Sequence, residues 1–598
     1  MPKNNRRMNE HQMQTSAVRR LAEPLVLLLG GAFLLQISRL HREVAEAYLA
    51  GGEAAARHVL VLHRLQFVYG VLLLVFALGS YLLSLGGDSM GAALLRQVRF
   101  ETGRLRNPAG GPRTTSIPGL WWLGIAMAIG IGLRVCFVDQ PMRYDEAYSF
   151  LRFVKGDYSD LFFYPLPNNH VLYTILEKLS VLAVGPNPVG IRLPALLFGA
   201  ALIPATWSLC RKLDRESSGI FAAICIAAMP FLVLYSSNGR GYSLLTLLAV
   251  AIPYVMLEDD GRLLSRRWLL PALLSALGML VMPSMLFALA GLCVWSACVL
   301  AIQTKGWKEA LLFLAPYAVV TAFLTLLFYT PVAIRSGGWD SLTSNRFIQP
   351  LPTAAFRAGV VPHLLDTIHD FSRDIPEVVT VLVMLLAALG MYAAFRKRNH
   401  VLMLLLPGLL VGAGILFIAK SSIPFSRTWI YLIPFFAIAA DAGVSRCCTR
   451  LSPPSRRTVM SAIAALAALY AFRLISQNAV AAYPDTGRSI GARETASFLG
   501  PMLTMSDTIC AKLPTDSVIA YYLWRDVAPR DLQSRPSSNR LFIVRAESGP
   551  QGTDSSIEGA VHLFSSSETA LYEWTAQTEP PEAIRRYTCW PSAGLAGK

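Results

Sequence analysis

The chain has 598 residues, of which 54% are hydrophobic and only 15% are charged, and its mean hydropathy is +0.45. Soluble proteins carry about 25% charged residues, so this composition excludes an ordinary soluble enzyme. The formal net charge of +16 does not indicate a nucleic-acid partner, because the basic residues are scattered over many short segments instead of gathering on one face.

Apolar blocks recur along the chain at about the length that crosses a hydrocarbon core, roughly 20 residues. The first block follows a basic start and has no small-residue cleavage site, so we expect an anchor and not a cleaved signal peptide. We predict an α-helical polytopic membrane protein with about thirteen transmembrane helices, at residues 24–40, 65–86, 119–138, 191–210, 219–236, 241–257, 268–283, 284–302, 309–330, 377–395, 401–419, 428–446 and 457–475.

Lysine and arginine are concentrated in every second connection between these blocks. Cytoplasmic loops carry such an excess, so the pattern predicts a cytoplasmic N-terminus and a tail on the outer side of the membrane. No Asn-x-Ser/Thr sequon occurs in the sequence, which favours a bacterial inner (plasma) membrane over the endoplasmic reticulum.

The predicted spans and topology divide the chain into three parts. Residues 1–118 hold the cytoplasmic start and two extra transmembrane helices, and residues 119–475 form the transmembrane core with outside loops at 139–190 and 331–376. The first loop contains the amphipathic stretch Val171–Val184, which we expect along the membrane surface. Residues 476–598 predict a small extracytoplasmic α/β domain, with buried strands at 517–524 and 540–546 and a short helix at Thr495–Met502.

The tail contains no Gly-rich phosphate loop, so we expect no cofactor there. It contains two of the nine cysteines, Cys510 and Cys589, and we predict that they form a disulfide in an oxidising compartment. The other cysteines lie in or beside the predicted spans, where we expect them to serve in packing.

Two adjacent acids, Asp145 and Glu146, follow the third predicted span in the segment Arg143-Tyr144-Asp145-Glu146. One interpretation is helix capping, with Asp145 as the cap and Glu146 in the first turn. The alternative is chemical, because acids at the mouth of a membrane cavity are costly to desolvate and usually have a function.

The same loop continues with Asn168, Asn169 and His170, whose amides and imidazole suit sugar hydroxyls. A Pro/Asn turn that leads into a helix at His170 explains them equally well. We expect no metal site, because His363 and His369, the histidines of the outside loop 331–376, lack ligand spacing.

Three arginines are predicted on the same side of the membrane as the acids: Arg192, Arg240 and Arg427. Arg240 shares a tight turn with Tyr242. Each arginine could reach towards lipid headgroups, or bind a phosphate with its fork of donors. Together with the acids they favour a reaction in which a carboxylate deprotonates an acceptor hydroxyl and arginines stabilise a departing lipid phosphate in place of a metal.

In these residues the sequence resembles the GT-C superfamily of polyprenyl-phosphate-sugar glycosyltransferases, and within it the family 39 group, which includes protein O-mannosyltransferases and bacterial lipid A aminoarabinose transferases. The resemblance covers residues 119–475, and its features run in order: the Asp145-Glu146 pair, the Pro/Asn/His segment, Arg192-Leu193-Pro194, Arg240-Gly241-Tyr242 and Arg427-Thr428-Trp429.

The resemblance implies a GT-C fold and an inverting, metal-independent glycosyltransferase. Asp145 would be the base, Glu146 its supporting acid, and Arg240 the group that holds the donor phosphate. Arg143, Tyr144, Asn168, Asn169, His170, Arg192, Tyr242 and Arg427 would bind substrate. The sequence departs from relatives that act on lipid A, which often carry a lysine where this chain has Asn168-Asn169-His170.

The expected partners are membrane lipids, a polyprenyl-phosphate-sugar donor and an envelope acceptor (a lipid, glycan or protein hydroxyl), without nucleic acid. Two other functions use the same features: a lipid or polysaccharide transporter or flippase, and a non-enzymatic envelope scaffold with the tail as docking module. The sequence shows no internal repeat, and the centres of the predicted spans hold almost no charged residues, whereas both features would favour a transporter.

Overall fold

The computed structural model describes residues 24–39, 42, 63–77, 99, 117–258, 260–264, 267–336, 342, 349–527, 540–546, 560–574 and 587–595. Within this part of the chain, eight helices are long and apolar enough to cross a membrane, and four shorter apolar helices accompany them. The protein is therefore a multi-pass membrane protein.

Every predicted span falls on a helix, although residues 78–86 of the second span lie outside the described part. The first two helices are Pro24–Arg39 and His63–Ala77. The remaining helices of the bundle are α4 (Ile117–Cys136), α7 (Pro188–Leu213), α8 (Ile220–Ala228), α9 (Pro230–Ser236), α10 (Tyr242–Met256), α11 (Leu269–Val281), α12 (Met285–Thr304), α13 (Lys308–Arg335), α16 (Glu377–Arg396), α17 (His400–Lys420), α18 (Ile433–Cys448) and α19 (Pro453–Ser476).

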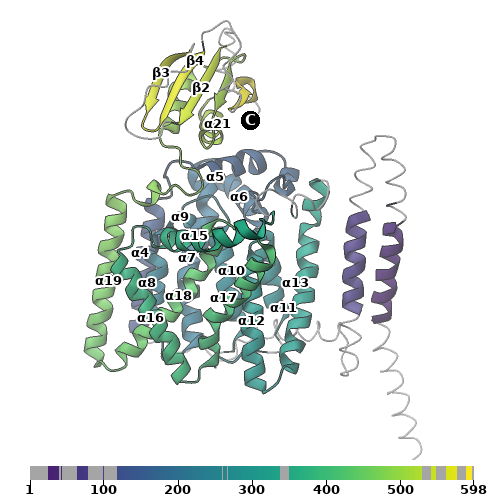
Figure 1. Ribbon diagram of the computed structural model, residues 1–598. Coiled ribbons are helices and arrows are strands. Elements are labelled where there is room, and N and C mark those ends of the chain that lie inside the picture. The colour runs from purple at the N-terminus through teal and green to yellow at the C-terminus, as the bar shows by residue number, and fades with distance from the viewer. Residues whose placement is uncertain are drawn as a thin grey trace, which may run out of the picture.

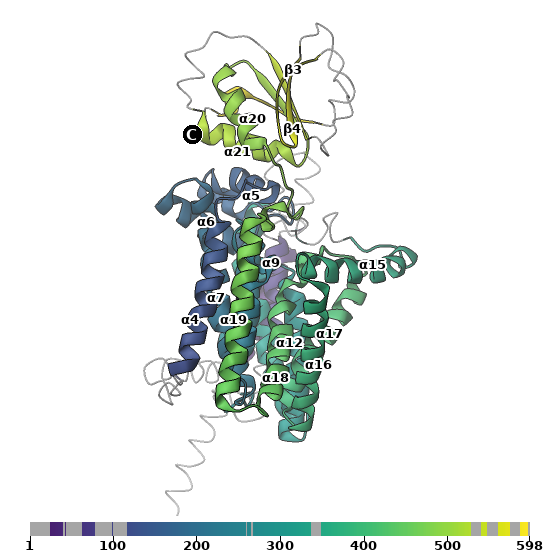
Figure 2. The same cartoon turned by 90° about the vertical axis from the view of Figure 1, so that its left-hand side faces the viewer.

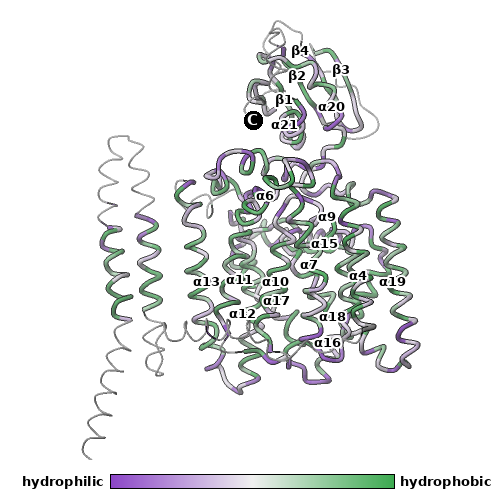
Figure 3. The backbone as a smooth tube through the Cα atoms, turned by 180° about the vertical axis from the view of Figure 1, so that it is seen from behind, coloured by the Kyte–Doolittle hydropathy of each residue, from purple (hydrophilic) through white to green (hydrophobic). Residues whose placement is uncertain are grey.

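The helices of the bundle run side by side, with hydrophobic residues along their middles and hydrophilic residues at their ends (Figures 1 and 3). Short helices gather at the end of the bundle that faces the C-terminal domain: α5 (Tyr144–Ser149), which continues into the π-helix η1 (Phe150–Val154), and α6 (Val171–Val184), the amphipathic helix expected from the sequence. A further helix, α15 (Thr353–Ser372), projects sideways from the bundle (Figure 2).

A buried arginine, Arg134 of α4, explains how one span is interrupted between α8 and α9. Pro230 has no N–H, so it leaves the carbonyl of Ile226 without its normal helical partner. Arg134 supplies donors instead, from Nη2 to the Ile226 oxygen at 3.1 Å and from Nη1 to the Ala227 oxygen at 3.0 Å. The break is therefore compatible with a membrane, where each unsatisfied backbone group is costly.

The start of α8 depends on a second buried charged residue, Asp441 of α18. Its carboxylate accepts hydrogen bonds from the amides of Gly219, Phe221 and Ala222 at 2.9–3.3 Å, and from the Ser217 hydroxyl. The first N–H groups of a helix have no partner inside it and carry a partial positive charge. Asp441 thus caps α8 from a neighbouring helix and joins the two.

The C-terminal domain contains a five-stranded sheet in the order β3-β4-β2-β1-β5, in which β1 and β2 pair in parallel and the other pairs are antiparallel. The strands are β1 (Thr508–Ala511), β2 (Leu541–Ala546), β3 (Ala560–Ser566), β4 (Thr569–Trp574) and β5 (Thr588–Pro591). The strand at 540–546 and the helix at Thr495–Met502 are confirmed, the latter as α20 (Ala492–Leu499) followed by the 3-10 helix η5 (Gly500–Met502).

The predicted strand at 517–524 is wrong, because these residues lie in helix α21 (Thr515–Asp526). The helix packs between the sheet and α5 in one continuous core, so eight of its twelve residues are buried. A short run that is apolar on all sides has no clear periodicity, and its sequence does not distinguish a buried strand from a buried helix.

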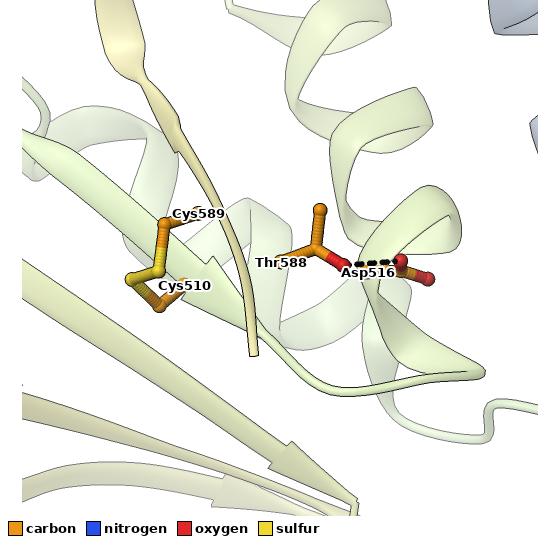
Figure 4. Close-up of a disulfide and its surroundings, with 4 residues drawn as sticks. All are labelled: Cys510, Asp516, Thr588 and Cys589. Atoms are coloured by element: carbon orange, nitrogen blue, oxygen red, sulfur yellow. Dashed lines mark hydrogen bonds between the residues drawn. A yellow bond between two sulfur atoms is a disulfide. The ribbon is translucent and has the colours of Figure 1, made fainter. Parts of the chain in front are cut away.

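The predicted disulfide between Cys510 and Cys589 is confirmed (Figure 4). The two residues are register partners on the paired strands β1 and β5, which places their side chains on the same face of the sheet. Next to them, the Thr588 hydroxyl donates to Asp516 of α21 at 3.1 Å and joins β5 to that helix.

The C-terminal domain also contacts the short helices at the end of the bundle. Phe150 of η1 packs against the rings of Tyr521 and Trp524, with ring centroids 5.5 and 5.2 Å away. The Met142 amide, just before α5, donates to the Tyr522 hydroxyl at 3.0 Å. Helix α21 therefore lies directly against the segment that carries Asp145 and Glu146.

Replacing Asp441 by alanine should destabilise the protein by about 3 kcal/mol, because several buried donors lose a charged acceptor. Asp441→Asn should cost less, since it keeps one acceptor oxygen. Thermal unfolding of the detergent-purified protein measures both. Asp260→Ala, which removes an exposed partner of Arg262, is the control and should have little effect. An unchanged unfolding temperature in Asp441→Ala would contradict the capping role.

Candidate active site

The two adjacent acids lie in the first turn of α5, but neither is its N-cap. The N-cap is Arg143, so the prediction that Asp145 caps the helix is wrong. Glu146 accepts the Arg143 backbone N–H at 2.9 Å and thereby does part of the capping. Asp145 is left with its carboxylate available for another role.

Glu146 is fully engaged with protein partners. Arg192 of α7 donates to it from both Nε, at 3.0 Å, and Nη2, and the Gly239 amide donates at 2.7 Å. Both side chains of this ion pair are completely excluded from solvent. Arg192 also donates to the carbonyls of Val138 and Gln140, each at 2.7 Å. The pair thus joins α5, α7 and the turn before α10, and it presents no free polar atom on Glu146.

Asp145 lies opposite Arg427, which belongs to the 3-10 helix η3 (Ser426–Leu432). The Arg427 Nη2 and Asp145 Oδ2 atoms are 3.5 Å apart, and the two side chains are 16% and 12% exposed. Within the described residues, Asp145 Oδ2 and Arg427 Nε have no hydrogen-bond partner. The Arg427 guanidinium also lies 4.3 Å from the ring centre of Phe425. The Asp145 carboxylate and the Arg427 guanidinium are thus close together, and each has hydrogen-bonding capacity that the described residues do not use.

Arg240 is more completely engaged. Its Nη1 donates to the Asn168 carbonyl at 2.7 Å and to the Ser149 hydroxyl, and its Nη2 donates to Asn168 Oδ1 and lies 3.0 Å from His170 Nε2. Only Nε has no partner in the described structure. Arg240 therefore holds the loop before α6 against α5 and the turn before α10.

His170 and Tyr242 lie beside Arg240 and are close neighbours, with their rings edge to face and 5.2 Å apart. The Gly241 amide donates to His170 Nδ1 at 2.9 Å, which requires this nitrogen to be unprotonated. Burial, and then the charges of Arg240 and Arg427, hold the pKa of His170 well below its usual range. The imidazole is consequently neutral at physiological pH.

Asn169 and Arg143 point into the protein. Asn169 donates to the carbonyls of Leu161 and Phe163, each at 2.9 Å, and accepts from Thr174. Arg143 donates to carbonyls of the linker between α19 and the C-terminal domain, at Val480, Ala481, Tyr483 and Asp485. The side chains of Asn169 and Arg143 therefore hold parts of the protein together. Tyr144 packs against the ring of Tyr148, with ring centroids 5.8 Å apart.

Tyr235 and Asn238, which the sequence analysis did not single out, also face this region. Within the described residues the Tyr235 hydroxyl and Asn238 Oδ1 are buried without a hydrogen-bond partner. Tyr235 interacts electrostatically with Arg427 and Asp145. Tyr235 stands at the end of an apolar stretch, and no motif in the sequence indicates a functional role for it. Asn238 belongs to the same turn as Arg240, and its Asn-Gly pair is a turn motif that could have identified it as a candidate site residue.

Glu177 of α6 is a third buried acid near the site. Neither of its carboxylate oxygens has a hydrogen-bond partner among the described residues. Burial, and then the nearby charge of Glu146, raise the pKa of Glu177 well above its usual value, while Arg240 acts in the opposite direction. Burial therefore favours the protonated form of Glu177 over its carboxylate.

No protein-family model matches this sequence, and no curated protein matches it. Solved structures do match. ArnT from Cupriavidus metallidurans bound to undecaprenyl phosphate is 15% identical, with a TM-score of 0.52, over 77% of this chain and 98% of that one. The apo state of the same protein gives 13% identity and a TM-score of 0.51 over 80% and 98%.

A more distant match is the apo Archaeoglobus fulgidus oligosaccharyltransferase, which is 13% identical over 71% of this chain and 61% of that one, with a TM-score of 0.42. These proteins are GT-C superfamily glycosyltransferases. The two ArnT matches span nearly the whole of that protein, and they show that this chain has the GT-C fold.

The raised pKa of Glu177 makes its replacement by glutamine a test with a defined pH dependence. The folded protein keeps the proton above pH 4.5, where the unfolded chain releases it, so this group makes wild type less stable as pH rises. Glu177→Gln removes that effect, so its unfolding temperature relative to that of wild type should rise as the pH increases above the unfolded value of about 4.5. Glu494→Gln, at an exposed acid of α20, is the control. A constant difference between Glu177→Gln and wild type would show that Glu177 is ionised in the folded protein.

Proposed function

We propose that this protein transfers a sugar from a polyprenyl-phosphate carrier to a hydroxyl of an envelope acceptor, which is a lipid, glycan or protein, on the outer side of a bacterial inner membrane. The single observation that supports this most directly is the pairing of Asp145 with Arg427, each of which has a buried polar atom without a hydrogen-bond partner in the described part of the chain. The GT-C fold supports the same class of reaction.

In this proposal Asp145 is the general base. It takes the proton of the acceptor hydroxyl, whose oxygen attacks the anomeric carbon of the donor sugar. The bond between that carbon and the phosphate oxygen breaks, and its electron pair leaves with the lipid phosphate. A single displacement inverts the configuration at this carbon, and a positioned base contributes about 10²–10⁴-fold to such a step.

Arg427 takes the role that the sequence resemblance gave to Arg240. A phosphate needs free donors, and the guanidinium of Arg240 uses both terminal nitrogens for the loop before α6. Among the described residues, Arg427 contacts Asp145 and the ring of Phe425 and makes no such loop-holding hydrogen bonds. Its permanent charge stabilises the leaving phosphate without a metal. Arg240, Glu146 and Arg192 then hold the loops that surround the reaction.

Asp145→Asn should abolish transfer, because an amide takes no proton from the acceptor. Cells that depend on this variant should accumulate the same polyprenyl-phosphate sugar as cells without the protein, measured by mass spectrometry of extracted lipids. The matched control is Asp139→Asn, at an exposed acid close in the chain, which should behave as wild type. Normal lipid-linked sugar levels in Asp145→Asn cells at wild-type protein abundance would refute the role of Asp145.

The two arginines can be separated by binding undecaprenyl phosphate to the purified protein. Arg427→Gln should weaken binding about tenfold or more, because the phosphate loses a charge-assisted hydrogen bond in a partly desolvated site. Arg240→Gln should mainly lower the unfolding temperature, since it removes bonds that hold the loop. If Arg240→Gln weakens binding at unchanged stability and Arg427→Gln does not, Arg240 is the phosphate ligand.

A further inference from the structure

Helix α15 (Thr353–Ser372) has three different sides, and it projects sideways from the bundle at the end nearest the C-terminal domain (Figure 2). One side faces the protein and buries Phe356 and Thr367. The second side is polar and exposed, with Asp366 and His369. The third side carries large apolar residues that recur at helical spacing and are 44–62% exposed: Val361, Leu364, Leu365 and Ile368. A continuous apolar stripe of this kind indicates a surface that another partner covers.

The protein-facing side of α15 contacts η3, the segment that carries Arg427. The Trp429 indole N–H of η3 donates to His363 Nε2 of α15 at 2.8 Å. Phe417 of α17 packs beside both elements, with its ring centre 5.1 Å from that of Phe356 and 5.9 Å from that of Trp429. Arg427 and Trp429 lie two residues apart in η3. A displacement of α15 would therefore displace the backbone that holds Arg427.

The apolar side of α15 continues the lipid-facing surface of the bundle. The segment before α15 is tied to the end of α17, where the Leu351 amide donates to the Ser421 carbonyl at 2.8 Å, and α16 begins shortly after α15, at Glu377. Both spans expose large apolar side chains at these ends: Ile418 of α17 is 66% exposed and Val378 of α16 is 79% exposed. In a membrane-spanning bundle such side chains contact lipid chains. The apolar stripe on α15 therefore borders the hydrocarbon core at the ends of two spans.

We propose that α15 lies in the membrane interface on the side of the C-terminal domain, with its apolar side among lipid chains and its polar side in water. This contact with the bilayer positions η3 through the hydrogen bond between His363 and Trp429. A helix with one apolar and one polar side binds the boundary between headgroups and acyl chains in this orientation. Arg357, near the start of the helix on the apolar side, is exposed and has a side chain long enough to reach headgroup phosphates. The location of α15 is independent of the proposed function, whereas its effect on Arg427 as a phosphate ligand rests on that function.

Spin labels on the full-length protein, in nanodiscs of phosphatidylethanolamine and phosphatidylglycerol, test the location. Leu365→Cys and Asp366→Cys place labels at adjacent residues on different sides of α15. By power-saturation electron paramagnetic resonance, the label at position 365 should collide mainly with oxygen, which partitions into hydrocarbon, and the label at position 366 mainly with a water-soluble nickel complex. The signal of labelled wild type, which has the exposed Cys136 and Cys447, is subtracted. Equal access of the nickel complex to both labels would overturn the location.

The affinity of the same nanodisc-embedded protein for undecaprenyl phosphate tests the positioning of η3. His363→Phe keeps an aromatic ring but removes the acceptor of the Trp429 N–H, and it should weaken binding about three- to tenfold, the equivalent of one lost hydrogen bond. His363→Gln, whose side-chain oxygen can accept the same bond, should restore most of the affinity. The matched control is His369→Phe, at the exposed histidine on the polar side of α15, which should bind as wild type.

The recovery in His363→Gln separates positioning from general damage, because a damaged site would not regain affinity when only the acceptor returns. Equal affinity of His363→Phe and wild type, with wild type binding normally, would overturn the positioning of η3 by α15 and leave the proposed function standing. Absence of binding by wild type itself would overturn the proposed function together with the positioning, while the spin labels still decide the location of α15.

Discussion

Glu146 and Arg192 form a bidentate ion pair from which solvent is completely excluded. Charges in such a position are costly unless every polar atom finds a partner. Here the Arg143 and Gly239 amides donate to Glu146, and carbonyls at the end of α4 accept from Arg192. The pair consequently fixes α5 relative to α4, α7 and the turn before α10. The orientation of Asp145, the next residue to Glu146, follows from this anchor.

The same helix is held from the other side by the C-terminal domain and its linker. Arg143 donates to the linker carbonyls, Tyr522 accepts from the Met142 amide, and Thr486 accepts from Asp145. Removing residues 476–598 would therefore remove the acceptors that cap α5 as well as a folded domain. Loss of activity in such a truncated protein would have two explanations: loss of a docking module, or loss of groups that hold the active site. Single substitutions in the linker leave the domain in place and separate these explanations.

Arg134 and Asp441 show a related constraint inside the bundle. Each is a buried charged side chain within a predicted span, and each satisfies backbone groups that a helix break or a helix start leaves unpaired. A charge within a span is usually taken as a sign of a transport path. In this protein both residues have a structural explanation. Around Asp145 and Arg427, by contrast, several buried polar atoms have no hydrogen-bond partner among the described residues: Asp145 Oδ2, Arg427 Nε, the Tyr235 hydroxyl and Asn238 Oδ1.

The helical spans and the amphipathic helix α6 could be predicted from the sequence, because hydropathy over about 20 residues and helical periodicity are local properties. The disulfide could be predicted because Cys510 and Cys589 are the only two cysteines of the tail. The sequence also singled out the two acids and three arginines through the order of their motifs. The tertiary structure decided which of them have free polar atoms. Glu146, Arg192 and Arg240 use their hydrogen bonds to hold distant segments, whereas Asp145 Oδ2 and Arg427 Nε have no hydrogen-bond partner among the described residues. The physical reason is that the groups that hydrogen-bond to a buried charge can come from any part of the chain. The spacing of sequence motifs and the amino-acid composition do not predict them.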